Sequence, residues 1–177
     1  MRIVSGTLRG RRIIAPNKLP ARPTTDFAKE SLFNILHHEI SWPTTTVIDL
    51  FAGIGSITLE ALSRGAECVW SIDSHAPTVR WLSGITKELR LEDRSRIVRG
   101  DALKWFRSYT GKAGLVFADP PYDFAYYAEL IDAVTSHSTF NQGLFVLEHR
   151  KGLSFSEHPN FADQRTYGEV SFTFFRP

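Results

Sequence analysis

Apolar and polar positions along the chain predict alternating strands and helices from residue 46 onward. Short apolar runs bounded by turn residues are typical of buried strands, whereas apolar positions three and four apart are typical of amphipathic helices. The pattern predicts strands over 46–51, 67–72, 95–99, 115–118 and 143–148, and helices over 56–64, 76–91, 102–109 and 124–136. Such alternation predicts an α/β fold with a doubly wound, mostly parallel sheet.

The pattern changes in the first part of the chain. Residues 2–14 alternate loosely around two glycines, which predicts a small β-hairpin. Thr24, Thr25 and Asp26 are good N-cap candidates for a helix that continues to about residue 38. We therefore expect a hairpin and helix over 1–42, as an extension of a main domain over 43–177.

The last part of the chain predicts a pair of strands, 161–167 and 169–175. Val170, Phe172 and Phe174 alternate with polar or smaller residues, which favours a half-buried antiparallel edge of the sheet.

Composition narrows the class of protein. The length of 177 residues fits one domain, and no apolar run is long enough to span a membrane. The first residues lack the apolar core of a signal peptide. Cys68 has no second cysteine to pair with, and the histidines are not spaced as zinc ligands. We expect a cytoplasmic protein without a metal site.

Charge is spread unevenly along the chain. Residues 1–30 hold seven basic and two acidic residues, a balance of +5, whereas the rest holds fourteen basic and seventeen acidic residues, a balance of −3. A basic segment attached to a near-neutral body favours contact with phosphates of a nucleic acid. The alternative is an ordinary solvated basic face.

The most informative motif is Asp119-Pro120-Pro121-Tyr122, directly after the predicted strand 115–118. Open α/β sheets bind their ligands at this position. The prolines remove two N–H donors and fix two φ angles, so carboxylate and carbonyl acceptors remain in a rigid segment beside an aromatic ring. This combination suits a planar group with an exocyclic NH₂, such as a nucleobase. A proline-rich turn is the alternative.

A glycine-containing loop follows the first predicted strand of the main domain. Asp49 and Phe51 lead into Gly53 and Gly55, where the backbone can bend tightly and approach a ligand. The dinucleotide fingerprint requires a further small residue at the position of Thr58, so the pattern for NAD is incomplete.

Acidic residues end the next two predicted strands. Asp73 lies at the position from which a carboxylate accepts hydrogen bonds from ribose hydroxyls. Asp101, followed by Ala102, is suited to accept from an adenine amino group or to cap the next helix. Carboxylates at successive strand ends would serve phosphates poorly and a cationic cofactor well, which favours S-adenosylmethionine over NAD.

Together these motifs resemble a class I methyltransferase. Residues 2–11 (RIVSGTLRGR), 22–26 (RPTTD), 30–34 (ESLFN) and 59–66 (LEALSRGA) narrow the resemblance to the bacterial small-subunit (16S) rRNA guanine-N2 methyltransferases of the RsmD type. The resemblance covers essentially the whole chain. Three features depart from the family pattern: Asp73 replaces the usual glutamate, Phe27-Ala28-Lys29 replaces a segment that usually carries an arginine pair, and Ile54 stands where a small residue is common.

The resemblance implies a seven-stranded sheet with one reversed edge strand and S-adenosylmethionine as the cofactor. It assigns the target base to Asp119, Pro120 and Tyr122. Cofactor binding is expected at Asp49, Phe51, Gly53, Gly55, Asp73, Asp101, Ala102 and Asp119, and RNA contact at Arg9, Arg11, Arg12 and Arg22.

The implied activity is methylation of a guanine N2 amine, in rRNA or in an assembling 30S subunit, by a monomer. Adenine-N6 methylation of DNA or RNA shares the Asp-Pro-Pro-Tyr chemistry and is the enzymatic alternative. A non-catalytic RNA-binding module is the second alternative, and an NAD oxidoreductase is disfavoured by Thr58.

Overall fold

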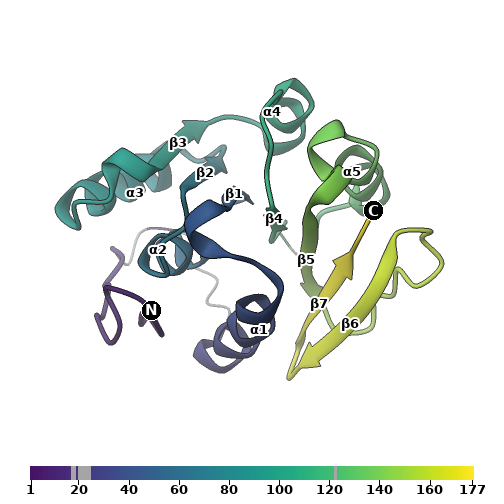
Figure 1. Cartoon of the computed structure of the whole chain (residues 1–177), viewed down its shortest axis with the longest axis horizontal. Helices are drawn as coiled ribbons and strands as arrows, with labels where there is room; N and C mark the ends of the chain where they lie inside the picture. Colours follow the sequence, from purple (N-terminus) through teal and green to yellow (C-terminus); the bar gives the residue numbers. More distant parts are fainter. Residues whose placement is uncertain (17–18, 20–24, 122) are drawn as a thin grey trace.

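A seven-stranded sheet forms the centre of the molecule (Figure 1). The computed structural model describes residues 1–16, 19, 25–121 and 123–177. The strands lie in the order β3-β2-β1-β4-β5-β7-β6. Their bounds are β1 Thr46–Leu50, β2 Cys68–Asp73, β3 Ser95–Arg99, β4 Leu115–Ala118, β5 Leu144–Arg150, β6 Phe161–Tyr167 and β7 Val170–Phe175. Strands β1 to β5 are parallel, which confirms the predicted fold class.

The reversed strand lies inside the sheet and not at its edge. Strand β7 pairs antiparallel with β5 on one side and with β6 on the other. The side chains from Ser171 to Phe175 are buried. The prediction of a half-buried, reversed edge strand is therefore wrong, because the β6–β7 hairpin folds back so that its second strand joins β5.

Helices cover both faces of the sheet, as predicted for a doubly wound fold (Figure 1). Helices α1 (Asp26–Glu39), α2 (Ser56–Ser63) and α3 (Ala76–Glu88) pack on one face, and α4 (Ala102–Ser108) and α5 (Tyr127–Thr135) pack on the other. Short 3₁₀ turns η1 (Trp42–Thr44), η2 (Glu92–Arg94) and η3 (Ser138–Gln142) complete the order of elements. Each face of the sheet buries its own apolar cluster.

Helix boundaries follow the predictions to within a few residues. The helix predicted over 76–91 ends at Glu88, because Arg90 takes a left-handed conformation with φ 57° and closes the helix. The helix predicted from residue 124 begins at Tyr127, since Phe124 belongs to a turn in which its N–H donates to the Pro121 carbonyl at 2.9 Å.

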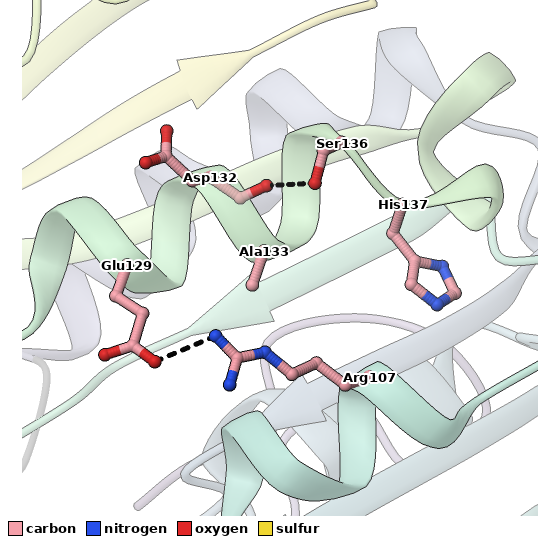
Figure 2. A pocket seen from close by; sticks show the side chains of 6 residues that line it. All are labelled: Arg107, Glu129, Asp132, Ala133, Ser136 and His137. Carbon is pink, nitrogen blue, oxygen red and sulfur yellow. Dashed lines mark hydrogen bonds and ion pairs between the residues drawn. The ribbon is translucent and has the colours of Figure 1, made fainter.

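Helices α4 and α5 are joined across a shallow groove by an ion pair. The Arg107 guanidinium donates to Glu129 at 2.8 Å (Figure 2). His137 and Ser136 line the same groove, and the Ser136 hydroxyl donates to the Asp132 carbonyl at 2.6 Å. Both partners of the ion pair are about half exposed, so solvent screens it and its contribution to stability is small.

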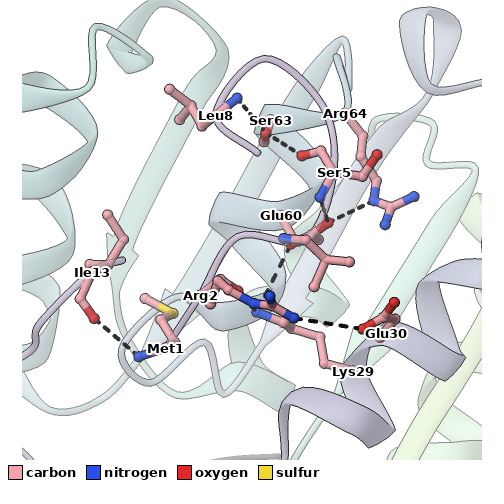
Figure 3. A network of polar contacts seen from close by, with 11 residues as sticks. Met1, Arg2, Ser5, Leu8, Ile13, Lys29, Glu30, Glu60, Ser63 and Arg64 are labelled. Atoms are coloured by element: carbon pink, nitrogen blue, oxygen red, sulfur yellow. Dashed lines mark hydrogen bonds and ion pairs between the residues drawn. The ribbon is translucent and has the colours of Figure 1, made fainter. Parts of the chain in front are cut away.

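The N-terminal segment forms a short antiparallel hairpin, in which Arg2 bridges Arg12 and Met1 exchanges two backbone hydrogen bonds with Ile13, at 3.0 and 3.1 Å. Its backbone also bonds to α2. The N–H groups of Val4 and Ser5 donate to the Glu60 carboxylate at 2.8 and 3.0 Å (Figure 3). The predicted hairpin is therefore confirmed, and the Glu60 side chain holds its first arm against α2.

Glu60 is the centre of a buried network of charges. It is fully buried, and the Arg64 guanidinium donates to it at 2.9 Å (Figure 3). The Lys29 ammonium, also buried, lies 3.9 Å from the Glu60 carboxylate and donates to the Arg2 carbonyl at 2.5 Å. Burial lowers the pKa of Lys29, and the charge of Glu60 opposes that effect. Segment 1–13, α1 and α2 are thus tied together through one carboxylate.

The packing of segment 1–13 on α1 and α2 also adds to the apolar core. Ile3 and Ile13 are buried in the apolar cluster that α1, α2 and α3 form on the sheet. Residues 1–42 therefore share a core with the rest of the chain, and their separation as a domain extension remains a prediction.

Gly6 is required where the N-terminal segment meets α2. A Cβ at Gly6 would lie 1.9 Å from the Ser63 carbonyl oxygen, and its φ is +83°. Gly10 has the same φ of +83° with no atom near its Cβ position, which makes it a matched control.

We expect Gly6→Ala to lower the free energy of unfolding by about 3 kcal/mol, because the segment must detach or shift. Gly10→Ala should cost about 1 kcal/mol, the ordinary cost of a left-handed alanine. Thermal unfolding of both variants measures the difference. Equal losses would show that the close approach at Ser63 does not constrain the segment.

Candidate functional site

Four neighbouring parallel strands end in acidic residues at one edge of the sheet. Asp101 follows β3, Asp73 ends β2, Asp49 is the penultimate residue of β1, and Asp119 follows β4. Because β3, β2, β1 and β4 are adjacent and parallel, their carboxyl ends meet at the same edge. The structure therefore brings together the acidic residues that the sequence predicted as one site, at the edge where open α/β sheets bind ligands.

The loop after β1 has an unusual backbone. Phe51, Gly53 and Gly55 have φ of 64°, 53° and 78°, in the left-handed region. Such a conformation costs about 1–2 kcal/mol in a residue other than glycine, so Phe51 stores strain at this edge. At Gly55 a Cβ would lie 2.4 Å from the end of the Leu82 side chain of α3, which can move aside, so the positive φ and not the packing favours glycine there.

Asp73 is fixed by backbone donors. Its Oδ2 accepts from the N–H of Gly53 at 2.8 Å, and its Oδ1 accepts from the N–H of His75 at 2.8 Å. One carboxylate thus joins the end of β2 to the glycine loop after β1. The carboxylate keeps further lone pairs for a ligand, since each ionised carboxyl group has about four acceptor sites.

Asp49 lies beneath the loop. It is buried, and its Oδ2 accepts from both the N–H and the hydroxyl of Thr58, at 3.1 and 2.6 Å. The Thr58 hydroxyl also bonds to the Ser71 hydroxyl at 2.7 Å. Burial raises the pKa of Asp49 to about 7; the bonds from Thr58 oppose this shift, and the charges of Asp119 and Asp73 add to it.

Thr58 and Ser71 are residues of the site that sequence reasoning missed. Thr58 entered only as a mismatch to the dinucleotide fingerprint. It is fully buried at the start of α2 and connects Asp49 of β1 to Ser71 of β2. A glycine or alanine there would leave the buried carboxylate without its hydroxyl donor, so the mismatch itself was the available signal.

Asp101 caps helix α4. Its Oδ1 accepts from the Lys104 N–H at 2.8 Å, the arrangement of an N-cap side chain. Its role as a cap is confirmed, and a role in binding remains a prediction for the exposed carboxylate. Ala102, the first helical residue, is buried against the sheet.

The Asp119 segment leaves β4 beside the glycine loop. The Asp119 N–H donates to the Leu50 carbonyl at 3.4 Å, and Pro120 is buried. Phe124, farther along the same segment, packs edge-on against Phe51 with ring centroids 5.5 Å apart. Tyr122 lies outside the described residues. The cofactor side and the target side of the predicted site are therefore in direct contact through Phe51 and Phe124.

The predicted RNA-binding arginines lie on the N-terminal segment. Arg9, Arg11 and Arg12 are exposed, and Arg11 forms an ion pair with Glu88 at 3.4 Å. Ser63 and Glu88, which the segment contacts, end α2 and α3, and these ends point toward the amino edge of the sheet. Arg9 and Arg11 thus lie away from the edge that carries Asp119. Arg22 lies outside the described residues.

Two further observations concern other kinds of site. Within residues 1–16, 19, 25–121 and 123–177, no group of three or more His, Cys, Asp or Glu side chains is placed to hold a metal ion. No helix of the described part of the chain is long and apolar enough to cross a membrane. The groove between α4 and α5 contains none of the predicted site residues (Figure 2).

Comparison with known proteins supports the resemblance found in the sequence. The family model described as "Conserved hypothetical protein 95" matches residues 1–176. YlbH of Bacillus subtilis is 32% identical over 162 residues, which are 89% of this chain and 86% of that protein.

A relative with a more specific name is the ribosomal RNA small subunit methyltransferase D of Buchnera aphidicola, which is 30% identical over 86% of this chain and 79% of its own length. The solved structure of a hypothetical protein from Thermus thermophilus shares 27% identity and superposes with a TM-score of 0.83, covering 100% of this chain and 99% of that one. The chain belongs to the RsmD-type family of methyltransferases.

Proposed function

We propose that this protein transfers a methyl group from S-adenosylmethionine to the exocyclic N2 amine of a guanine in small-subunit rRNA. The observation that carries the proposal is the contact between the two halves of the site. The Asp119-Pro120 acceptors leave β4 directly beside the loop and carboxylates at the ends of β1 and β2. Membership of the RsmD-type family supports rRNA as the substrate.

The residues at the carboxyl edge fit S-adenosylmethionine. When bound, this cofactor supplies an electrophilic methyl group on a positively charged sulfur. Asp73 and Asp119 lie close enough for their charges to raise the pKa of Asp49, so the edge favours a cation. A phosphate-bearing cofactor would meet the same carboxylates with repulsion.

Individual roles in holding the cofactor follow from the contacts. Asp73, fixed by two backbone N–H groups, would accept from ribose hydroxyls. Asp101 would accept from the adenine amino group beside Ala102. Gly53 and Gly55 would let the backbone approach the cofactor closely. Phe51, which packs on Phe124, would form one wall of the cofactor site.

Asp119 and Pro120 would position the target amine. The lone pair of a guanine N2 amine is delocalised into the ring, so the amine is a poor nucleophile. Hydrogen bonds from its two N–H groups to the Asp119 carboxylate and the Pro120 carbonyl would favour pyramidal geometry and stabilise the developing positive charge. The product ammonium is acidic, so a strong general base is not required. Most of the acceleration would come from alignment of two bound reactants.

The base must leave its stack to reach this site, because the target atom is inaccessible inside paired RNA. Tyr122 would stack on the extruded base, a contact worth about 1–3 kcal/mol. The N-terminal arginines would hold phosphates farther along the RNA, over the face formed by α1 and α2.

Labelled methyl transfer to unmodified small-subunit particles tests the proposed activity. We expect one labelled nucleotide, mapped as an N2-methylguanine. Label in an adenine would favour the N6 alternative, and no transfer to either rRNA or particles would contradict the proposal.

Asp119→Ala should lower kcat by at least about 100-fold, because the target amine loses a hydrogen-bond acceptor that stabilises the positive charge developing in the transition state. The Kd for S-adenosylhomocysteine, measured by calorimetry, should change little. Asp123→Ala is the control, since Asp123 is an exposed carboxylate on the same segment. An unchanged kcat in Asp119→Ala would contradict a catalytic role for Asp119.

The raised pKa of Asp49 predicts a pH effect on stability. The folded protein holds a proton on Asp49 up to pH of about 7, whereas the unfolded chain releases it near the ordinary value of 3.8. This group therefore makes the free energy of unfolding fall as pH rises between about 4 and 7. In Asp49→Asn that contribution should vanish, so the difference between wild type and variant changes across this window in calorimetric unfolding. A constant difference would contradict the shift.

Replacement of Arg9, Arg11 and Arg12 by alanine should weaken RNA binding and flatten its salt dependence. Each lost phosphate contact should reduce the slope of log K against log salt by about 0.7 for single-stranded RNA. Arg107→Ala is the control, because Arg107 lies across the sheet on α4 and is paired with Glu129. An unchanged slope in the triple variant would place the phosphate contacts elsewhere.

A further inference from the structure

A row of aromatic rings connects the core beneath Asp119 to the surface. Phe117 lies in β4, two residues before Asp119, and is buried against Phe172 of β7 with ring centroids 6.5 Å apart. Phe172 contacts Tyr167 at 6.0 Å, and Tyr167 contacts Phe27 at 5.9 Å in an edge-to-face arrangement. The outer rings are therefore supported by packing that begins in the strand of the catalytic segment.

Phe27 is exposed to an unusual degree for its type. Seventy per cent of the residue is accessible, although it lies in the first turn of α1, where polar residues are ordinarily found. Only three large hydrophobic residues in the described part of the chain are exposed, and two of them are rings packed edge-on against a neighbour: Phe27 on Tyr167 and Tyr126 on Phe124. Phe27 and the half-buried Tyr167 together leave aromatic surface open to solvent, and the faces of aromatic rings are the surfaces on which unpaired bases stack.

The register of the strands places Phe27 and Tyr167 at the carboxyl edge of the sheet, the edge that carries Asp119 (the catalytic edge). Ala118 at the end of β4 is level with Leu147 of β5, and β5 continues to Arg150, which pairs with Val170. The β6–β7 turn thus rises about 10 Å beyond the end of β4. Tyr167 of β6 lies three strands from β4, a lateral distance of about 14 Å. Helix α1 begins beside Tyr167, which Phe27 contacts, and ends beside Arg176, which follows β7 and pairs with Glu39, so its first residues lie at the same edge as the β6–β7 turn.

Charges around the pair are mixed. Glu30 pairs with Arg2 at 3.9 Å, Asp26 begins α1, and the backbone of Lys151 bonds to that of Glu169 at 2.9 Å. Among the described residues around the pair, Arg2, Arg150 and Lys151 are matched in number by Asp26, Glu30 and Glu169, and Arg9 and Arg11 lie toward the opposite edge. What this surface offers at the catalytic edge is the face of a ring, which suits an unpaired base.

We propose that Phe27, supported by Tyr167, is a stacking platform for an unpaired base of the RNA substrate, a few nucleotides from the methylated guanine. The proposal rests on the proposed function and adds the surface that holds the strand beside the flipped base.

The test compares two fluorescent single-stranded RNAs of about 12 nucleotides, one of oligouridine and one with abasic sites in the same backbone. Both carry the same phosphates. The Kd of the abasic RNA divided by the Kd of oligouridine (the RNA ratio) therefore reports contacts to bases. Protein saturated with S-adenosylhomocysteine is titrated with each RNA, as wild type, Phe27→Leu and Phe27→Tyr. Leucine keeps the apolar bulk without the ring, whereas tyrosine keeps the ring.

We expect Phe27→Leu to reduce the ratio by at least about 5-fold, the effect of one lost stacking contact, and Phe27→Tyr to keep it. A ratio unchanged by Phe27→Leu, or equal binding of both RNAs by the wild type, would overturn the platform. Equal melting temperatures of the variants check that folding is unaffected.

Methyl transfer to unmodified small-subunit particles separates the possible failures. With a base platform, Phe27→Leu should raise KM and leave kcat within about twofold. A raised KM together with an unchanged RNA ratio would identify a ribosomal protein as the contact, and would overturn the proposal. Absence of transfer by the wild type would contradict the proposed function. The RNA ratio would still show whether Phe27 stacks on a base.

Discussion

The buried carboxylate of Glu60 is the interaction on which the arrangement of the N-terminal third depends. It accepts from the backbone of Val4 and Ser5 and is paired with Arg64, and the Lys29 ammonium lies 3.9 Å away. A buried carboxylate without such partners would cost several kcal/mol, so the donors must assemble around it together. Folding of segment 1–13 is therefore coupled to the packing of α1 on α2, and the Arg64 guanidinium extends the network over the ring of Phe33 at 4.9 Å.

The carboxyl edge of the sheet combines features that each cost stability. Phe51 adopts a left-handed backbone, Asp49 is buried with a raised pKa, and the charges of Asp73 and Asp119 act on it. Strained backbone and clustered like charges persist where binding or catalysis requires them. The hydrogen bonds of Thr58 and Ser71 offset part of the cost, which explains why polar residues are buried between β1, β2 and α2.

Much of the fold and site was predictable from local pattern. The apolar runs at 95–99 and 115–118 predicted β3 and β4 with their bounds, and parallel strands necessarily bring Asp49, Asp73, Asp101 and Asp119 to one edge. Long-range partners were not predictable in this way. The position of β7 inside the sheet, the Glu60 network and the ring contact of Phe27 with Tyr167 depend on residues far apart in the sequence, and no periodicity records them.

The position of β7 between β5 and β6 has a consequence for the order in which the sheet can form. Strands β1 to β5 can pair as they leave the ribosome, but β5 keeps an open edge until β7 has been synthesised. An exposed edge of Phe145, Val146 and Leu147 invites pairing with other chains. During synthesis the last strand in sequence is thus the one that protects the centre of the sheet, and we expect chaperone dependence to be greatest just before it emerges.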